Sequence, residues 1–138
     1  MTALWQDLVT YLVSGSTLVA GTDLFVGDLL PSPDDVTVLF EYPGMGPRET
    51  FGDNTKPAVI RPRIQVLGRA GGTATAAYTN ARTRVRTVYD LLTVVANEQL
   101  SGTTYFRGEA IQEPFMLHRD ENDRVVFACN FDIWRVAE

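Results

Sequence analysis

The sequence predicts an α+β fold, with a mainly antiparallel sheet of about four to five strands and two helices packed on one face. Two segments repeat apolar residues at helical spacing, and several others alternate apolar and polar residues or are rich in β-branched and aromatic ones. The elements follow in the order α-β-β-β-α-β-β. The chain has 138 residues, of which 45% are hydrophobic, so we expect residues 1–138 to form a single domain with its own core.

The first predicted element is an amphipathic helix. Its apolar residues recur at spacings of three and four and lie on one helical face: Leu4, Trp5, Leu8, Tyr11 and Leu12. Thr2 fits the N-cap position, and the run Ser14-Gly15-Ser16 ends the pattern. A short strand is expected at residues 23–27. A longer strand is expected at residues 36–42, which are rich in β-branched and aromatic residues.

Residues 43–58 interrupt the regular pattern. They contain three prolines and three glycines, which leave no room for a helix or a regular strand. We therefore predict an extended loop at about 43–58. A connection of about 15 residues without secondary structure is often functional or an interaction arm, and a plain surface loop is the equal alternative.

A long strand is predicted at residues 59–70. Ile60, Ile64 and Val66 point to one face of this strand, and arginines dominate the other. Pro62 lacks an amide hydrogen, so the strand is expected at a sheet edge or bulged at that residue.

The second predicted helix covers about residues 73–97. Its buried stripe consists of Tyr78, Ala81, Val85, Val88, Leu92 and Val95, and Arg86 and Asp90 are spaced as an i,i+4 ion pair. Two further strands are predicted at residues 103–117 and 125–134. The last strand has apolar residues on both faces, which predicts that both faces are covered.

The charges are segregated along the chain. The net charge of −5 combines eight acids and two bases in residues 1–60, six arginines without an acid in 61–86, and nine acids with four bases in 87–138. Lys56 is the only lysine. The arginines of the central block could form a solvated polar face or a subunit and partner interface, for which the candidates are Arg61, Arg63, Arg69, Arg82 and Arg86.

The sequence offers little for catalysis or for metal binding. A single Cys and a single His exclude an internal disulfide and a typical structural zinc site. Cys129 falls on the apolar face of a strand, as an inert thiol does, so a catalytic pair with His118 is not expected. Glu109 and Glu113 lie about 13 Å apart at strand rise, too far for an acid/base pair. We predict no enzyme, no cofactor and no metal site.

Nucleotide, calcium and membrane binding are also not expected. Residues 44–49 lack the third glycine of a dinucleotide fingerprint, and the acidic turn at 120–123 lacks the glycine and closing glutamate of a calcium loop. The longest apolar stretches are far shorter than the roughly 20 residues that span a bilayer. The N-terminus has no signal-peptide pattern, which predicts a protein used in the cytosol or assembled there.

Several runs of the sequence carry a family resemblance. They are residues 57–70 and residues 24–31, together with Tyr78-Thr79-Asn80-Ala81-Arg82 and Val88-Tyr89-Asp90-Leu91-Leu92. They resemble the small tail-completion or minor capsid proteins of long-tailed bacteriophages, in particular the tail terminators, from about residue 4 to the C-terminus. The resemblance implies a structural virion protein that caps the tail tube as a ring, expected to be a hexamer. Such a ring stops tube polymerisation and joins the tail to a head-closure or connector protein.

The resemblance also implies where this protein is found and what it contacts. Its partners would be copies of itself, the tail tube protein and the connector, while genomic DNA passes through the ring without specific binding. It would lie in the neck of the virion, after assembly in the host bacterial cytoplasm, with no membrane involved. The loop at 43–58 becomes a candidate axial arm, with Met45, Pro47, Arg48 and Phe51 as contact residues. Another neck component and a small host-modulating binding protein remain the alternatives.

Overall fold

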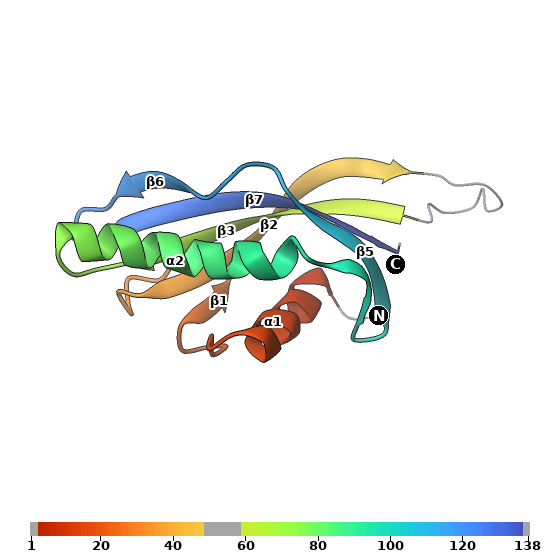
Figure 1. Ribbon diagram of the computed structural model, residues 1–138, viewed down its shortest axis with the longest axis horizontal. Helices are drawn as coiled ribbons and strands as arrows, with labels where there is room; N and C mark the ends of the chain where they lie inside the picture. Colours follow the sequence, from red (N-terminus) through yellow and green to blue (C-terminus); the bar gives the residue numbers. More distant parts are fainter. Residues whose placement is uncertain (1–2, 49–58, 137–138) are drawn as a thin grey trace.

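The computed structural model describes residues 3–48 and 59–136, which form two helices and one seven-stranded sheet (Figure 1). The elements, in chain order, are α1 (Leu4–Gly15), β1 (Leu24–Val26), β2 (Val36–Arg48), β3 (Val59–Ala70), α2 (Ala74–Leu92), β4 (Ala96–Leu100), β5 (Thr103–Ala110), β6 (Phe115–Arg119) and β7 (Val125–Val136). The α+β class is confirmed, but the sheet has more strands than the four to five expected.

The sheet is mixed, which corrects the expectation of a mainly antiparallel one. Its strand order is β1-β2-β3-β7-β5-β4, and β6 pairs with the first half of β7. β1 pairs parallel with β2, because the connection at residues 27–35 returns the chain to the end of the sheet where β1 began. The segment predicted as one strand at 103–117 is divided into β5 and β6 by residues 111–114, which end at a proline.

α2 ends at Leu92, five residues before the predicted end of this helix, and β4 follows it. Asn97 and Ser101 have positive φ angles of 51°, a conformation that helical residues do not adopt, and Gly102 has a φ of 83°. These residues shape β4 and its tight hairpin connection to β5. The backbone therefore leaves the helix after Leu92, although the apolar spacing predicted a helix to about residue 97.

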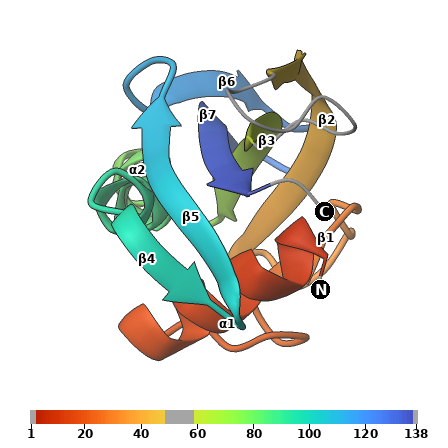
Figure 2. The same ribbon diagram turned by 90° about the vertical axis from the view of Figure 1, so that its right-hand side faces the viewer.

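Both helices pack on the same face of the sheet and share one core with it, as the sequence predicted. Figure 2 shows α1 lying between β4 and β1, the two ends of the strand order. Leu8 and Leu12 of α1 and Val85 and Val88 of α2 are fully buried in this core. Gly68 allows α2 to approach β3, because a Cβ there would lie 2.8 Å from a methyl group of Val85.

The other face of the sheet is also partly covered. Leu67 of β3 and Val126 and Ala128 of β7 form a second, smaller apolar cluster. Leu29, Phe40 and Phe115 pack against this cluster. β7 is therefore buried on both faces in its first half, which confirms the prediction made from its apolar composition.

The expected loop at 43–58 is partly strand. β2 continues to Arg48, and Met45 pairs with Arg61 of β3, so Met45, Pro47 and Arg48 lie in a strand and not in a loop. The register shifts on either side of Met45, where prolines without an amide hydrogen interrupt the ladder. β1 pairs only with the first part of β2, so these prolines lie in a portion whose other edge pairs with no strand of residues 3–48 and 59–136. Phe51 and the rest of 49–58 lie outside the described residues.

Of the two alternatives predicted for Pro62, the sheet edge is wrong, and an irregular pairing at this residue is confirmed in the β2–β3 ladder. β3 lies between β2 and β7, and its ladder with β7 keeps one register from Val59 to Ala70. The irregularity lies in β2 instead, where the register shifts between the pairs Tyr42–Arg63 and Met45–Arg61. The neighbouring strand therefore bulges opposite the proline, and β3 itself stays regular.

Candidate subunit and partner interface

Two of the predicted interface arginines share a single carboxylate. Arg63 donates two hydrogen bonds to Asp132, from Nε at 2.7 Å and from Nη2 at 3.3 Å, and Arg61 Nη2 lies 3.9 Å from the same carboxylate. The β3–β7 register brings these groups together, because Arg63 is directly opposite Asp132. The hydrogen bond to Asp132 raises the pKa of Arg63. The cluster therefore has one more positive than negative charge.

Aromatic rings extend this cluster across the sheet. The guanidinium of Arg61 lies 4.3 Å from the ring centroid of Trp134, and those of Arg107 and Arg63 lie 5.9 Å from Trp134 and Tyr42 respectively. We call Tyr42, Arg61, Arg63, Arg107 and Trp134 the arginine–aromatic stripe. It lies on the face opposite the helices, since its members in β3 and β7 alternate with core residues such as Ile64 and Ile133.

Arg69 has an internal role instead. Its side chain is 2% exposed and donates hydrogen bonds to the carbonyl oxygens of Leu30 and Pro33, both at 2.6 Å, and of Asp34 at 3.2 Å. Burial lowers the pKa of its guanidinium. Arg69 therefore holds the connection at residues 27–35 against the sheet by hydrogen bonds. Its side chain is not accessible to a partner in this structure.

The two remaining candidates lie on α2. Arg86 bonds to Asp90 at 3.1 Å, which confirms the predicted i,i+4 pair, and to Glu113 at 3.0 Å, which links α2 to the segment between β5 and β6. Arg82 is exposed and has no ion pair with any residue that the structure describes. The predicted block is therefore divided among three places: the stripe, the buried connection and the surface of α2.

An acidic end lies at the edge of the molecule where β6 turns into β7 (Figure 1, left). Arg124 connects the turn between β6 and β7 to the connection at residues 27–35. It bonds to Asp120 at 2.7 Å, to Asp34 at 3.2 Å and to the carbonyl of Pro31 at 2.5 Å. The sequence predicted no role for Arg124. We call Asp34, Asp35, Asp120, Glu121 and Asp123 the acidic end. The sequence predicted the acidic turn but not its contact with the connection at residues 27–35.

A buried polar cluster lies between α1 and the sheet. The hydroxyl of Tyr105 donates a 2.5 Å hydrogen bond to Asp7, and Arg135 donates a 3.0 Å hydrogen bond to the same hydroxyl. All three side chains are buried, and burial raises the pKa of Tyr105. No local pattern in the sequence indicates this cluster, because its members come from three distant elements. It holds α1 in place and offers no open site.

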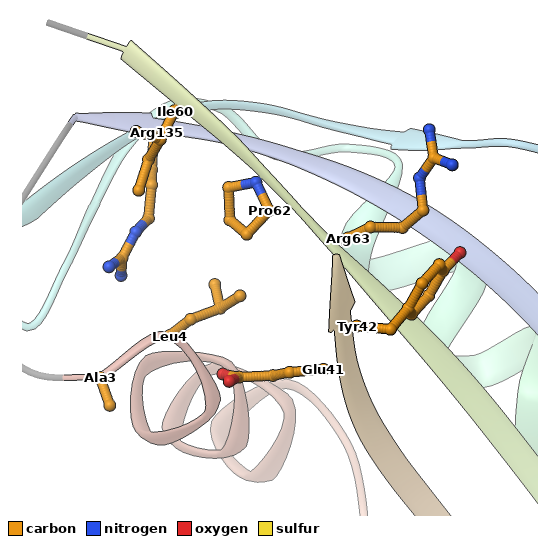
Figure 3. A pocket seen from close by; sticks show the side chains of 8 residues that line it. All are labelled: Ala3, Leu4, Glu41, Tyr42, Ile60, Pro62, Arg63 and Arg135. Carbon is orange, nitrogen blue, oxygen red and sulfur yellow. The ribbon is translucent and has the colours of Figure 1, made fainter. Parts of the chain in front are cut away.

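A groove of about 460 Å³ lies beside this cluster, between the start of α1 and the sheet (Figure 3). Leu4, Pro62 and Arg135 line it, while Arg63 and Tyr42 lie together farther along the sheet. Glu41, also at the groove, accepts a hydrogen bond from the backbone amide of Trp5. Among the described residues that line the groove there is no Ser, Cys or His side chain that could act as a nucleophile.

The reactive residue types lie elsewhere. Burial raises the pKa of Cys129 to about 11, so its thiol is neutral near pH 7 and donates to the carbonyl of Gln112 at 3.0 Å. Glu113 is engaged with Arg86, and Glu109 lies 3.7 Å from Arg107. Within residues 3–48 and 59–136, no group of three or more His, Cys, Asp or Glu side chains is placed to hold a metal ion. No helix in the same residues is long and apolar enough to cross a membrane.

The arginine–aromatic stripe combines residue types that are enriched where proteins bind one another. The sequence profile of the bacteriophage tail terminator proteins matches residues 11–135, and this chain belongs to that family. It is therefore a structural protein of a phage virion, as the sequence resemblance implied.

The solved structures add support for the fold. A chain in the structure titled "Virion of native gene transfer agent (GTA) particle" is similar to this one, with a TM-score of 0.52 and 20% sequence identity. The alignment covers 98% of this chain and 92% of the other. A search of curated proteins gives no significant match.

Proposed function

We propose that this protein is the tail terminator of its phage. Copies close into a hexameric ring on the end of the tail tube, stop the addition of tube subunits, and present the surface to which the head-closure or connector protein binds. Membership of the tail terminator family, over residues 11–135, is the observation that carries this proposal. Assembly takes place in the cytoplasm of the bacterial host.

The charges of the subunit fit this role. A ring of identical subunits needs two different surfaces that are complementary to each other, because each copy contacts the next in a heterologous way. This chain has an arginine-containing surface on the sheet and an acidic end, separated along the molecule. Its net charge of −5 also suits a channel through which DNA passes without binding, by repulsion of like charges.

The β2–β3 end of the molecule is the proposed axial contact. Met45, Pro47 and Arg48 lie in the part of β2 that extends beyond its pairing with β1, and Phe51 follows outside the described residues. A strand end with one unpaired edge can add backbone hydrogen bonds to a partner strand. We therefore assign contact with the tail tube or the connector to Met45, Pro47, Arg48 and Phe51.

Deletion of the gene from its phage tests the proposal. Without a terminator, tail tubes should grow beyond their normal length and should not join heads, as seen by electron microscopy of lysates. Addition of the purified protein to lysates of the deletion strain should restore joining. Tails of normal length beside heads that lose their DNA would contradict the proposal and would favour a head-closure protein.

A further inference from the structure

We propose that the arginine–aromatic stripe of one copy binds the acidic turn at residues 120–124 of a second copy, through the carboxylates of Glu121 and Asp123. This inference rests on the proposed ring and deepens it, because it names the two surfaces that form each subunit contact. The partner is a second copy of this chain, and the chemistry is the pairing of guanidinium groups with carboxylates.

The stripe has more positive than negative charge, because its three arginines face two carboxylates, those of Asp132 and Glu109. Arg61 and Arg63 share Asp132, whose side chain is 10% exposed, so one positive charge in this cluster has no counterpart. Arg63 is 29% exposed and Arg107 is 56% exposed, and these two guanidinium groups remain open to a partner. Arg107 is held only loosely by Glu109 at 3.7 Å. A carboxylate that enters between Arg63 and Arg107 supplies the missing charge.

The stripe also lacks hydrogen-bond acceptors. In the part of the chain that the structure describes, the Nε of Arg61 and the indole Nε1 of Trp134 are buried without an acceptor. Buried donors of this kind are costly and normally have a partner. Arginine and tryptophan are also the residue types that contribute most to binding energy at protein interfaces. The donors and rings of the stripe together suit a partner that is rich in carboxylates.

The turn at 120–124 is a preformed acidic tip. The carboxylate of Asp120 accepts hydrogen bonds from the amides of Asn122 and Arg124, both at 2.9 Å, and from Arg124 Nε at 2.7 Å. These bonds fix the backbone of the turn. Glu121 and Asp123 are exposed at its tip and have no ion pair with any other described residue. A rigid tip loses little conformational entropy when it binds, which favours the contact.

The positions of the two surfaces require a contact between copies. The turn precedes Val125 at the start of β7, whereas Trp134 lies near the end of the same strand. The strand between them spans about 30 Å at a rise of about 3.3 Å per residue, so the tip cannot reach the stripe of its own copy. The tip of one copy against the stripe of the next is a heterologous contact, the kind that closes into a ring.

Zero-length crosslinking tests this contact directly, because the chain contains one lysine, Lys56. Arg107→Lys keeps the charge of the stripe and places one additional amine in it. A carbodiimide joins an amine to a carboxylate only when the two groups are in contact. Tails isolated from phage that carry Arg107→Lys should give peptides in which position 107 is joined to Glu121 or Asp123. The matched control, Arg82→Lys, places an amine on the exposed surface of α2 and should give none of these peptides.

Charge reversal provides a second measurement. Arg63→Glu with Arg107→Glu should reduce the oligomer of this protein that forms on isolated tails by roughly tenfold, because like charges then face each other. Glu121→Arg with Asp123→Arg should reduce this oligomer to the same extent, and all four changes in one chain should restore it. Far-UV circular dichroism of each variant checks that the fold is retained.

The outcomes separate this contact from the function itself. Glu109 and Asp132 lie beside position 107 in its own copy, so peptides joining 107 to either of them are expected and decide nothing. Peptides joining position 107 to carboxylates of the tail tube protein, of the connector or of any other part of this chain, in place of Glu121 or Asp123, would overturn the proposed contact. So would the absence of any crosslink from position 107 on assembled tails. In each of these cases, normal tail length and normal head joining would still support the terminator function. Failure of the unaltered protein to bind tails would contradict that function.

Discussion

The hydroxyl of Tyr105 in β5 donates a 2.5 Å hydrogen bond to the carboxylate of Asp7 in α1, across 98 positions of sequence. Arg135 of β7 donates to the same hydroxyl at 3.0 Å and lies 3.8 Å from the carboxylate. A buried carboxylate is tolerated only when it is paired and hydrogen-bonded. Tyr105 therefore connects α1 to two strands of the sheet, at a place where apolar contacts alone would leave the position of the helix less defined.

Tyr105→Phe should lower the free energy of unfolding by about 1–3 kcal/mol, because the variant removes a buried donor and acceptor from the bonds with Asp7 and Arg135. Denaturant unfolding followed by circular dichroism measures this change. Tyr78→Phe is the matched control, since the Tyr78 side chain is 45% exposed, and it should change stability by less than about 0.5 kcal/mol. Equal losses in both variants would contradict the role given to the hydroxyl.

Asp132→Asn should lower the free energy of unfolding by about 1–3 kcal/mol, because Arg61 and Arg63 then face each other without a carboxylate. The loss should shrink in high salt, which screens the repulsion between the two guanidinium groups. Glu109→Gln removes an exposed acid of the same face and should cost less than about 0.5 kcal/mol. A stable Asp132→Asn variant would show that the shared carboxylate is not needed.

Arg69→Met should loosen the connection at residues 27–35, because it leaves the carbonyls of Leu30, Pro33 and Asp34 without their donor. The expected loss of stability is about 2 kcal/mol. Hydrogen exchange, read by mass spectrometry of peptides, should become faster in residues 27–35 than elsewhere. Arg82→Met, on the exposed surface of α2, should leave the exchange of that connection unchanged, and faster exchange there would contradict the assignment.

Cys129 should react slowly with a thiol reagent at pH 8 in the folded protein. Burial raises the pKa of its thiol to about 11, so the thiolate fraction at that pH is very small. In denaturant, Cys129 should be labelled at the rate at which the protein unfolds. Thr75→Cys places a second thiol on the exposed start of α2 and should react at once, beside the slow native thiol. Rapid labelling of Cys129 in the native state would contradict its burial.

The sequence predicted those features that depend on local periodicity. The two faces of β3 and the double coverage of β7 follow from residue spacing, and the structure confirms them. The predicted stripe of α2 is buried from Ala81 to Leu92, but Tyr78 is 45% exposed and Val95 lies beyond the end of the helix. The runs that resemble tail terminators were also local, and the family match confirms that resemblance.

The features that the sequence missed depend on register and on chain crossing. Arg63 meets Asp132 across 69 positions because β3 and β7 pair in one register, and no local pattern contains that register. The parallel pairing of β1 with β2 depends on the path of the connection at residues 27–35. Arg69 was predicted as an interface residue together with the other arginines of the block. Its buried position becomes evident only from the backbone carbonyls that surround it in the structure.

Imaging of intact virions tests the central claim most directly. Single-particle electron microscopy of phage particles, with this protein located by its fold, should show six copies in one closed ring between the tail tube and the connector. Density for this protein along the whole tube, on the head alone or in no ring at all would contradict the claim that it terminates the tail.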